Sequence, residues 1–476
     1  MTLVKHRSLS RRKFYVTNNY FVKTAVYILC VIGASSRLCA QEGWNRLPQV
    51  LQRITSPEFP HHDFDITRYG AIGDGQTDCS FAFRKAIETC NAQGGGRVVV
   101  PKGTFITGAL HLRSNVNLYV SKDAVIQFIV DPKKYLPVVF CRWEGVECMN
   151  YSPLIYAFEQ ENIAITGEGI LDGQADDEHW WKWRGRKDGG KDCQNEARNK
   201  LFEMGENNVP VTDRIFGEGS YLRPNFFEPY RCKNVLVRGV TFVNSPMWFL
   251  HPVLCKNVSF LNVTIDGLGP NNDGIDPESC TDVLVKNCFL NNGDDCLAIK
   301  SGRNNDGRRV NIPCENIVIQ GCTMKNGHGG VSIGSEISGS VRNVYIEDCT
   351  MDSPNLDRAL RIKTNAKRGG VVEKVYLRNS KVGQVAEAVI KVDFYYEEGE
   401  TGHFNPVVRD IEVKNLECDK SRFAVWIRAF EKSPATNITI ENCSFQHVEE
   451  KNVLDNVRNL SMVGIKMSMA AKPAGK

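Results

Sequence analysis

The sequence lacks the signatures of several protein classes. It has no Cys-x-x-Cys pair and no such pair followed by spaced histidines, which argues against a zinc site of that kind. Its 59 basic and 55 acidic residues give a formal net charge of only +4, so no global basic field favours a nucleic acid partner. Helical periodicity is almost missing from the second half of the chain, which disfavours helical repeats.

Acidic residues are also missing from the first forty positions, which carry seven Lys and Arg. Ala25 to Ala34 is an apolar run, and Ala40 precedes Gln41. This order predicts a secretory signal over 1–40, a polar lead-in over 41–60, and a secreted or periplasmic protein. The run is shorter than the roughly 20 residues of a membrane span, so we expect no stable membrane association; an uncleaved anchor is the alternative. Residues 41–476 hold 52 of the basic and all 55 acidic residues.

The seventeen cysteines are plentiful enough for disulfides in a secreted chain. Several of them, however, occupy matching places in repeated strand-like segments. Cysteine behaves as a small buried hydrophobe in such places, so we predict that most are stacked in the core. These repeated cysteines are Cys288, Cys322, Cys349, Cys418 and Cys443.

The chain repeats a short unit in which Asn or another polar residue precedes alternating apolar residues. The units are 23 to 36 residues apart, a period that indicates a solenoid. β-Branched alternation makes it a β-solenoid of stacked parallel strands, since a propeller blade needs about 40 to 50 residues. A helix over Ser80–Ala92 is expected to cap the first coil. The units begin at 234, 257, 282, 316, 343, 374, 410 and 437.

Four polar clusters interrupt these repeats. They lie 12 to 18 residues after the start of successive units, so stacking at about 4.8 Å per coil brings them to one side of the solenoid. By itself the Asp294-Asp295 pair is typical of a solvated turn. A cluster that keeps register with the coil indicates a functional site instead. The clusters are Asn271-Asn272-Asp273, Gly293-Asp294-Asp295, Gly327-His328-Gly329 and Arg361-Ile362-Lys363.

In this order the four clusters resemble the polygalacturonases, family 28 of the glycoside hydrolases. The resemblance implies an all-β fold: a single-stranded right-handed parallel β-helix with a short N-terminal capping helix. It covers residues 61–460, with loop insertions over 131–230 and a C-terminal tail over 461–476. The insertions hold Trp143 and the His179–Trp183 segment, whose aromatic rings stack on sugars or pack locally.

The resemblance also implies catalytic roles. Asp294 corresponds to the general acid, Asp273 and Asp295 to the pair that activates water, and His328 to the histidine that tunes the acid. A general acid must hold its proton near the working pH, and two neighbouring anions are expected to raise the pKa of Asp294. Activation of water, rather than attack on carbon, implies inversion at the anomeric centre.

Further residues are candidates for binding the substrate. Arg361 and Lys363 correspond to cations that hold a substrate carboxylate, and a guanidinium suits bidentate contact. The family also has a tyrosine after the Arg-Ile-Lys motif, for which Tyr395 and Tyr396 both qualify; Tyr395 is our candidate. The remaining candidates are Asn271, Trp248, His251 and Arg303. A packed loop explains Trp248 and His251 equally well, and a solvated charged turn is the alternative for Arg303.

The implied protein is a monomeric pectin-degrading glycosidase without cofactor or metal. Its partner is an acidic pectic polysaccharide of α-1,4-linked galacturonic acid, and long insertions favour attack from a chain end. Rhamnogalacturonan or another pectic oligosaccharide is the alternative substrate. A β-helix uronate lyase and a non-catalytic carbohydrate binder are alternatives of a different class.

Overall fold

The computed structural model describes residues 43–185 and 192–471, so the expected signal segment 1–40 lies outside the described residues. The chain divides into two units, Met1–Arg46 and Leu47–Lys476. The described part of the first unit is a 3-10 turn, η1 (Gly43–Arg46). Within the described residues, no helix combines the length and apolarity that crossing a membrane requires.

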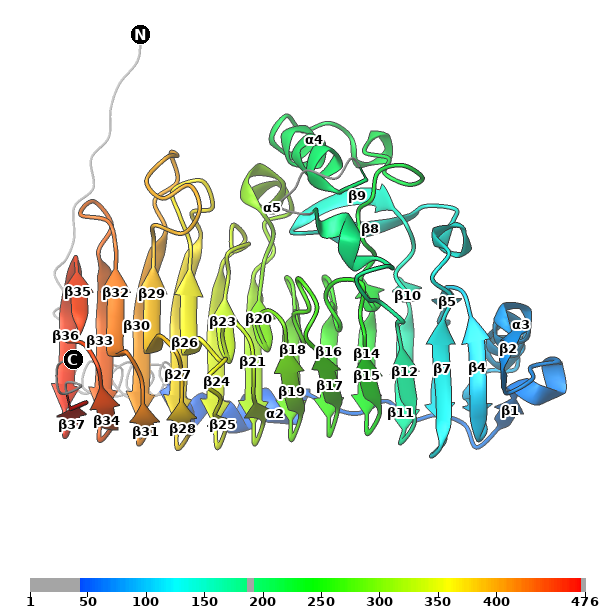
Figure 1. Ribbon diagram of the computed structural model, residues 1–476, viewed down its shortest axis with the longest axis horizontal. Helices are drawn as coiled ribbons and strands as arrows, with labels where there is room; N and C mark the ends of the chain where they lie inside the picture. The colour runs from blue at the N-terminus through cyan, green and yellow to red at the C-terminus, as the bar shows by residue number, and fades with distance from the viewer. Residues whose placement is uncertain (1–42, 186–191, 472–476) are drawn as a thin grey trace, which may run out of the picture. The chain divides into compact units, whose positions relative to one another are not determined.

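The second unit is a right-handed parallel β-helix, as predicted (Figure 1). Each coil contributes one strand to each of two 13-stranded parallel sheets. Sheet 1 contains β1 (Asp63–Asp65), β3 (Gly96–Val100), β6 (Val116–Val120), β11 (Glu161–Gly167), β14 (Lys233–Arg238), β16 (Lys256–Leu261), β18 (Thr281–Lys286), β21 (Cys314–Gln320), β24 (Val341–Glu347), β27 (Val371–Arg378), β30 (Val407–Lys414), β33 (Ala435–Glu441) and β36 (Val457–Val463). Sheet 2 contains β2 (Asp74–Asp78), β4 (Gly103–Thr107), β7 (Ala124–Phe128), β12 (Ile170–Asp172), β15 (Thr241–Val243), β17 (Thr264–Gly267), β19 (Phe289–Asn292), β22 (Thr323–Met324), β25 (Thr350–Met351), β28 (Lys381–Gln384), β31 (Glu417–Lys420), β34 (Ser444–Val448) and β37 (Lys466–Met469).

The third face of the coils, here called sheet 3, has a three-stranded and a six-stranded part. Single bridges through Leu250 and Ile275 connect the two parts. Sheet 3 faces the insertions and carries the candidate site. Its strands are β5 (Leu110–His111), β10 (Ile155–Phe158), β13 (Phe227–Tyr230), β20 (Leu297–Ile299), β23 (Val331–Ile333), β26 (Arg358–Lys363), β29 (Ala388–Asp393), β32 (Phe423–Arg428) and β35 (Val453–Asp455).

Asparagines at the start of several units stack on one another. Asn234, Asn257, Asn316 and Asn343 have positive φ, which asparagine tolerates better than most residues. The Asn257 amide donates to Asn234 at 2.8 Å, and the Asn343 amide donates to Asn316 at 3.1 Å. The repeated asparagine therefore turns each coil and hydrogen-bonds to the coil before it.

The cysteine prediction is confirmed. All fifteen cysteines among the described residues are free thiols, and all but Cys193 are buried. Thiols in matching positions donate weakly to backbone carbonyls; Cys322 Sγ lies 3.7 Å from the Val285 oxygen of the previous coil. These cysteines fill the core instead of cross-linking it.

The expected capping helix forms as α3 (Ser80–Ala92), which buries Phe83, Ile87 and Cys90 against the first strands. At the other end the β-helix continues beyond residue 460, because β36 and β37 add a further coil up to Met469. The predicted tail over 461–476 is therefore wrong up to that residue. The error arose because Asn459 begins a further repeat that the sequence analysis did not count.

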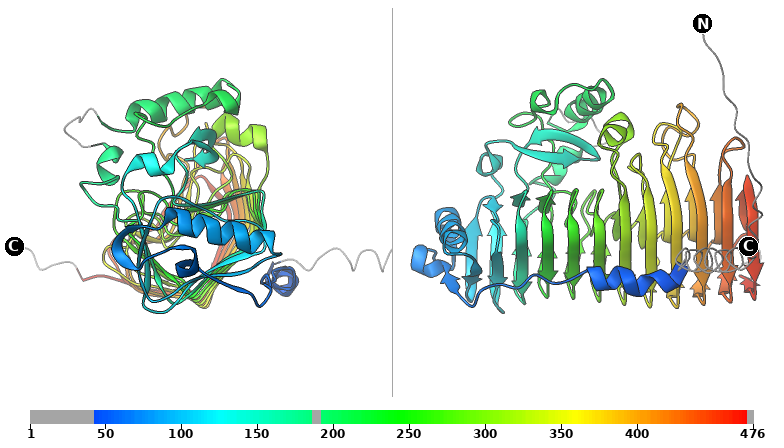
Figure 2. Two further views of the ribbon diagram at one scale, coloured as in Figure 1. Left: turned by 90° about the vertical axis from the view of Figure 1, so that its right-hand side faces the viewer. Right: turned by 180° about the vertical axis from the view of Figure 1, so that it is seen from behind.

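The insertions over 131–230 contain strands and a helix, whereas only loops were expected there. They hold an antiparallel hairpin of β8 (Val139–Trp143) and β9 (Val146–Asn150), and α4 (Asn195–Glu206). With α5 (Asn304–Val310), these elements rise above the middle of the β-helix in both side views (Figures 1 and 2). Short 3-10 turns complete the described structure: η2 (Ile66–Tyr69), η3 (Pro132–Tyr135), η4 (Trp181–Arg184) and η5 (Val211–Asp213).

The lead-in also contains a helix, α2 (Leu47–Arg53), which packs beside β18 and β21 of sheet 1. Arg53 pairs with Asp282 at 2.7 Å. The sequence analysis treated this stretch as a plain polar lead-in, because seven residues are too few for a clear helical pattern.

Candidate active site

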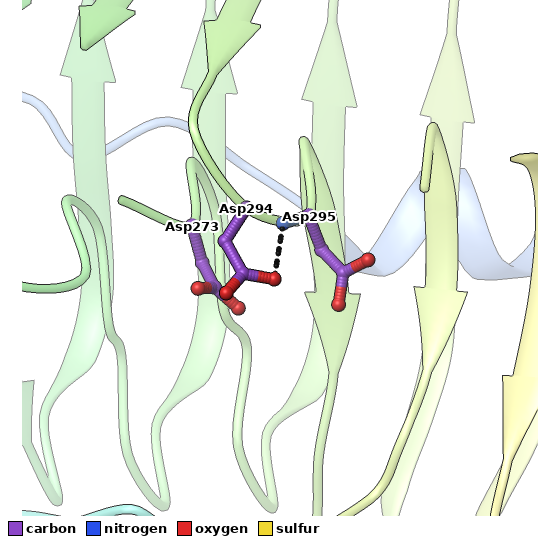
Figure 3. A group of neighbouring side chains, drawn as sticks. All are labelled: Asp273, Asp294 and Asp295. Atoms are coloured by element: carbon purple, nitrogen blue, oxygen red, sulfur yellow. Dashed lines mark hydrogen bonds between the residues drawn. The ribbon is translucent and has the colours of Figure 1, made fainter. Parts of the chain in front are cut away.

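Three aspartates meet where the chain passes from sheet 2 to sheet 3. Asp273 precedes the bridge at Ile275, and Asp294 and Asp295 connect β19 to β20. One carboxylate oxygen from each aspartate lies within 4.8 Å of the other two. Figure 3 shows the carboxylates of Asp273 and Asp294 side by side, with Asp295 directed toward the next coil. The structure thus brings together the carboxylates predicted from spacing.

Asp295 is completely buried and held by neighbouring coils. It accepts hydrogen bonds from Ser332 Oγ at 2.6 Å, Arg361 at 3.2 Å and Lys363 Nζ at 2.7 Å. Burial raises the pKa of Asp295, but the charges of Lys363 and Arg361 outweigh it and keep the pKa well below its usual range. Asp295 is therefore a fixed carboxylate, held by two cations.

Asp294 interacts with His328, whose Nδ1 lies 2.9 Å from Asp294 Oδ1. This hydrogen bond raises the pKa of His328 above its ordinary value. Burial raises the pKa of Asp294, but the hydrogen bond from His328 and the charge of Lys363 bring it below its ordinary value. Asp294 has 17% of its side chain exposed, against 4% for Asp273 and none for Asp295.

The raised pKa in this group belongs to Asp273. Burial and the charge of Asp294 raise the pKa of Asp273 well above its usual range. The raised pKa was expected at Asp294, but the direct hydrogen bond from His328 favours the ionised form of Asp294. Because their carboxylate oxygens lie within 4.8 Å of each other, Asp273 and Asp294 titrate as a coupled pair, and repulsion between the two charges favours a state in which they share one proton.

A second group of buried charges surrounds Lys300 next to the aspartates, and it was not predicted from the sequence. Lys300 Nζ lies 3.5 Å from Asp273, 3.5 Å from Glu336 and 3.9 Å from Asp276. All of these groups are buried. Lys300 and Asp276 fall five and three residues after predicted aspartates, and this proximity was the available signal.

A cavity of about 320 Å³ opens above these groups. The insertions form one wall of it through Glu144, Arg184 and Arg198, and Arg303 adds to that wall. The wall is braced by ion pairs: Arg198 with Glu144 at 2.8 Å, and Arg303 with Glu336 at 3.1 Å. Other lining residues include Trp248, Asn271, Asp294, Lys300, His328, Arg361, Lys363, Tyr396 and Glu397.

Two predicted binding residues are placed elsewhere, and these predictions are corrected. His251 is fully buried, with Nε2 2.8 Å from Glu278 and Nδ1 3.6 Å from Glu228, so it cannot meet a substrate. Tyr395 points away, with its hydroxyl 3.3 Å from Glu400. The neighbouring Tyr396 lines the cavity instead. Alternation along the chain puts adjacent tyrosines on different sides, and the sequence alone did not fix which one faces inward.

A parallel β-helix with grouped carboxylates and cations below a walled cavity defines the class of β-helix carbohydrate hydrolases. The family model for glycosyl hydrolases family 28 matches residues 217–465, which contain all four motifs. The chain is 45% identical to a hyperthermoactive exopolygalacturonase from Thermotoga maritima, covering 89% of this chain and 95% of that one, with a TM-score of 0.86.

Plant proteins are more distant relatives. A probable polygalacturonase from Vitis vinifera is 28% identical over 80% of this chain and 74% of its own length. An exopolygalacturonase from Zea mays is 25% identical over 83% of this chain and 86% of its own length. The chain belongs to family 28 of the glycosyl hydrolases and is a glycosidase.

Proposed function

We propose that this glycosidase hydrolyses α-1,4-linked polygalacturonan, removing sugars from one end of the chain. The observation that carries the proposal is the cation pair Arg361 and Lys363, which lines the cavity directly beside the aspartates. Each cation has more donors than its contacts with Asp295 use. A substrate carboxylate can therefore bind them next to the scissile bond, as a uronic acid polymer requires.

The proposed general acid is Asp294. It is the most exposed of the three aspartates and lines the cavity, so it can reach a leaving oxygen once it holds the shared proton. Asp273 and Asp295 activate the attacking water, and His328 controls the protonation of Asp294. Tyr396, Asn271 and Arg303 contact the sugar from the cavity wall.

Inversion is the proposed stereochemical course, although spacing alone favours the opposite. Carboxyl groups of inverting enzymes are usually about 6.5–9.5 Å apart, whereas oxygens of these three lie within 4.8 Å of one another. Hydrogen bonds from Ser332, Arg361 and Lys363 occupy Asp295, which restrains it from attacking carbon. NMR of the first product anomer decides: β-galacturonate supports inversion, and α-galacturonate contradicts it.

Action at a chain end follows from the wall of the cavity. Glu144, Arg184 and Arg198, which come from the insertions, line the cavity, and we infer that they block one end of it to a continuous polymer. On polygalacturonate we expect monomeric galacturonate from the earliest time points; an initial ladder of oligomers would contradict end-wise action. Rhamnogalacturonan serves as the comparison substrate.

Asp294→Asn tests the chemistry. We expect kcat to fall at least about 100-fold, in the range of general acid catalysis, with an unchanged thermal unfolding temperature. A matched control is Asp266→Asn, which removes an exposed carboxylate from the same coil system on sheet 2. Full activity of purified Asp294→Asn would overturn the assignment. The protein is expected to act as a secreted monomer on acidic pectic polysaccharide.

A further inference from the structure

Lys300 is a buried cation on the floor of the cavity. It follows β20, with 3% of its side chain exposed, yet it lines the cavity. Asp273, Asp276 and Glu336 surround its ammonium group at 3.5 to 3.9 Å. Coulomb attraction to these buried carboxylates raises the pKa of Lys300 despite its burial. Lys300 is therefore charged throughout the working range of the enzyme.

Trp248 restrains this cation. The Lys300 ammonium lies 4.3 Å from the centre of the Trp248 ring, a cation–π contact. His251 meets the same ring edge-on at 4.9 Å, and Glu278 fixes His251 at 2.8 Å. The two residues first considered for sugar contact thus form a support that keeps Lys300 close to Asp273.

The position of Lys300 matters because the shared proton of Asp273 and Asp294 can be bound to either carboxyl group. The proposed chemistry requires it on Asp294, the acid, with Asp273 ionised as a base. His328 opposes this arrangement, since it stabilises the Asp294 carboxylate from 2.9 Å. Lys300 lies 3.5 Å from Asp273, whereas His328 contacts Asp294, so the charge of Lys300 favours the ionised form of Asp273 and opposes the effect of His328.

We propose that Lys300 is a positioning residue that favours the ionised form of Asp273 and thereby leaves the shared proton to Asp294. The step is one proton transfer from a carboxyl oxygen of Asp273 to one of Asp294, with no other bond changed. The other charged groups that act on Lys300 or Asp273 include Arg223, Asp276, Asp295, Glu336 and Lys363. The inference rests on the proposed function and assigns a role that the four motifs do not include.

The first test compares the pH dependence of kcat/KM for wild type and Lys300→Met on oligogalacturonate. Loss of a positive charge within 4 Å raises carboxyl pKa values by about 1–3 units. We expect the acidic limb to move to higher pH by at least about one unit and the maximal kcat to fall. Lys300→Arg restores the position of the limb, because it restores the charge. Lys381→Met, an exposed lysine on sheet 2, leaves the profile unchanged.

A second measurement does not depend on turnover. Carbon NMR of aspartate-labelled protein follows the titration of Asp273 in wild type and Lys300→Met, and Asp273→Asn identifies its signal. We expect Asp273 to titrate at higher pH without Lys300. If Lys300→Met fails to fold, Lys300→Met combined with Asp276→Asn removes one charge of each sign and is measured instead.

The outcomes separate the two proposals. An unchanged acidic limb together with unchanged titration of Asp273 overturns the role of Lys300 and leaves the hydrolase assignment intact. Absence of hydrolysis by wild type overturns the proposed function, while the NMR titration still measures the effect of Lys300 on Asp273.

Discussion

At the scale of single residues, His251 is a buried group whose charge is linked to folding. It lies between Glu228 and Glu278 without exposed surface. Burial lowers its pKa, but its interactions with the two glutamates, a hydrogen bond to Glu278 and the nearby carboxylate of Glu228, raise the pKa overall to about 8. Because the folded-state value lies above the unfolded one, its stabilisation is complete below about pH 6.5 and is lost as pH rises through 8.

We therefore predict that the free energy of unfolding falls by about 2 kcal/mol between about pH 6 and pH 10. Calorimetric unfolding temperatures across this range give the measurement. His251→Gln keeps a hydrogen-bonding side chain without the charge, so its unfolding temperature should vary less with pH. His403→Gln, at an exposed histidine outside the site, is the control. An equal pH dependence in wild type and His251→Gln would refute the prediction.

The location of the motif aspartates, His328, Arg361 and Lys363 could be predicted from the sequence. Their offsets from the repeated asparagines place them on one side of each coil, and the stacking of successive coils brings them together. Lys300 and Glu336 could not be found in this way, because their side chains contact residues of neighbouring coils, and offsets along the sequence do not reveal such contacts. The location of the shared proton also escaped prediction, since it depends on the Asp294–His328 hydrogen bond.

At the scale of elements, α2 is attached to sheet 1 by a few polar contacts. Arg53 donates to Asp282 at 2.7 Å, and the Thr55 amide donates to Asn257 at 3.0 Å. Asp282 is almost fully buried, whereas Arg53 is 42% exposed. The segment from α2 to Thr55 thus lies against the stacked asparagines of sheet 1. Its ion pair depends on the buried carboxylate of Asp282.

We predict that Arg53→Met weakens this attachment by about 1 kcal/mol, since a partly exposed ion pair contributes little more. Hydrogen exchange of the peptide around Thr55 should become about fivefold faster, while exchange in β18 stays the same. Arg97→Met removes a comparable ion pair with Asp63 on the same sheet and serves as the control. Unchanged exchange around Thr55 would show that the ion pair does not hold α2.

Regular elements were predicted better than irregular ones. Alternating apolar residues identified the strands, and apolar residues at helical spacing identified the cap α3, because burial on one face imposes a different period on each kind of element. The hairpin β8–β9 and α4 were expected only as loops. They pack through contacts such as Arg198 of α4 with Glu144 of the hairpin turn at 2.8 Å, and the Glu147 amide of β9 with Asp306 of α5 at 2.9 Å, which no local period reveals.

At the scale of the second unit, the two ends of the β-helix are unlike. Helix α3 covers the first coil, whereas the last described coil is formed by β35, β36 and β37. Val453, Leu460 and Met462 of that coil are only partly buried. The coil therefore shields the well-packed strands β32 to β34, whose backbone edges and apolar residues would otherwise face solvent.

We predict that a chain ending at Glu450 self-associates through the uncovered edges of β32 to β34, which would expose Ile438, Ile440 and Phe445. Size-exclusion chromatography with light scattering at increasing concentration measures this. A chain ending at Ala470 keeps every described strand and should match wild type. A monomeric chain ending at Glu450 would contradict the protective role of the last coil.

Because nearly all described thiols are buried, the protein can be labelled selectively at one cysteine. Among the described residues, Cys193 is the partly exposed cysteine, and the other fourteen are buried in the core. Cys193 immediately precedes Gln194 and Asn195 on the cavity wall. A maleimide dye added to the folded protein should therefore react there first, without engineered cysteines. Its fluorescence would then report occupancy of the neighbouring cavity in real time.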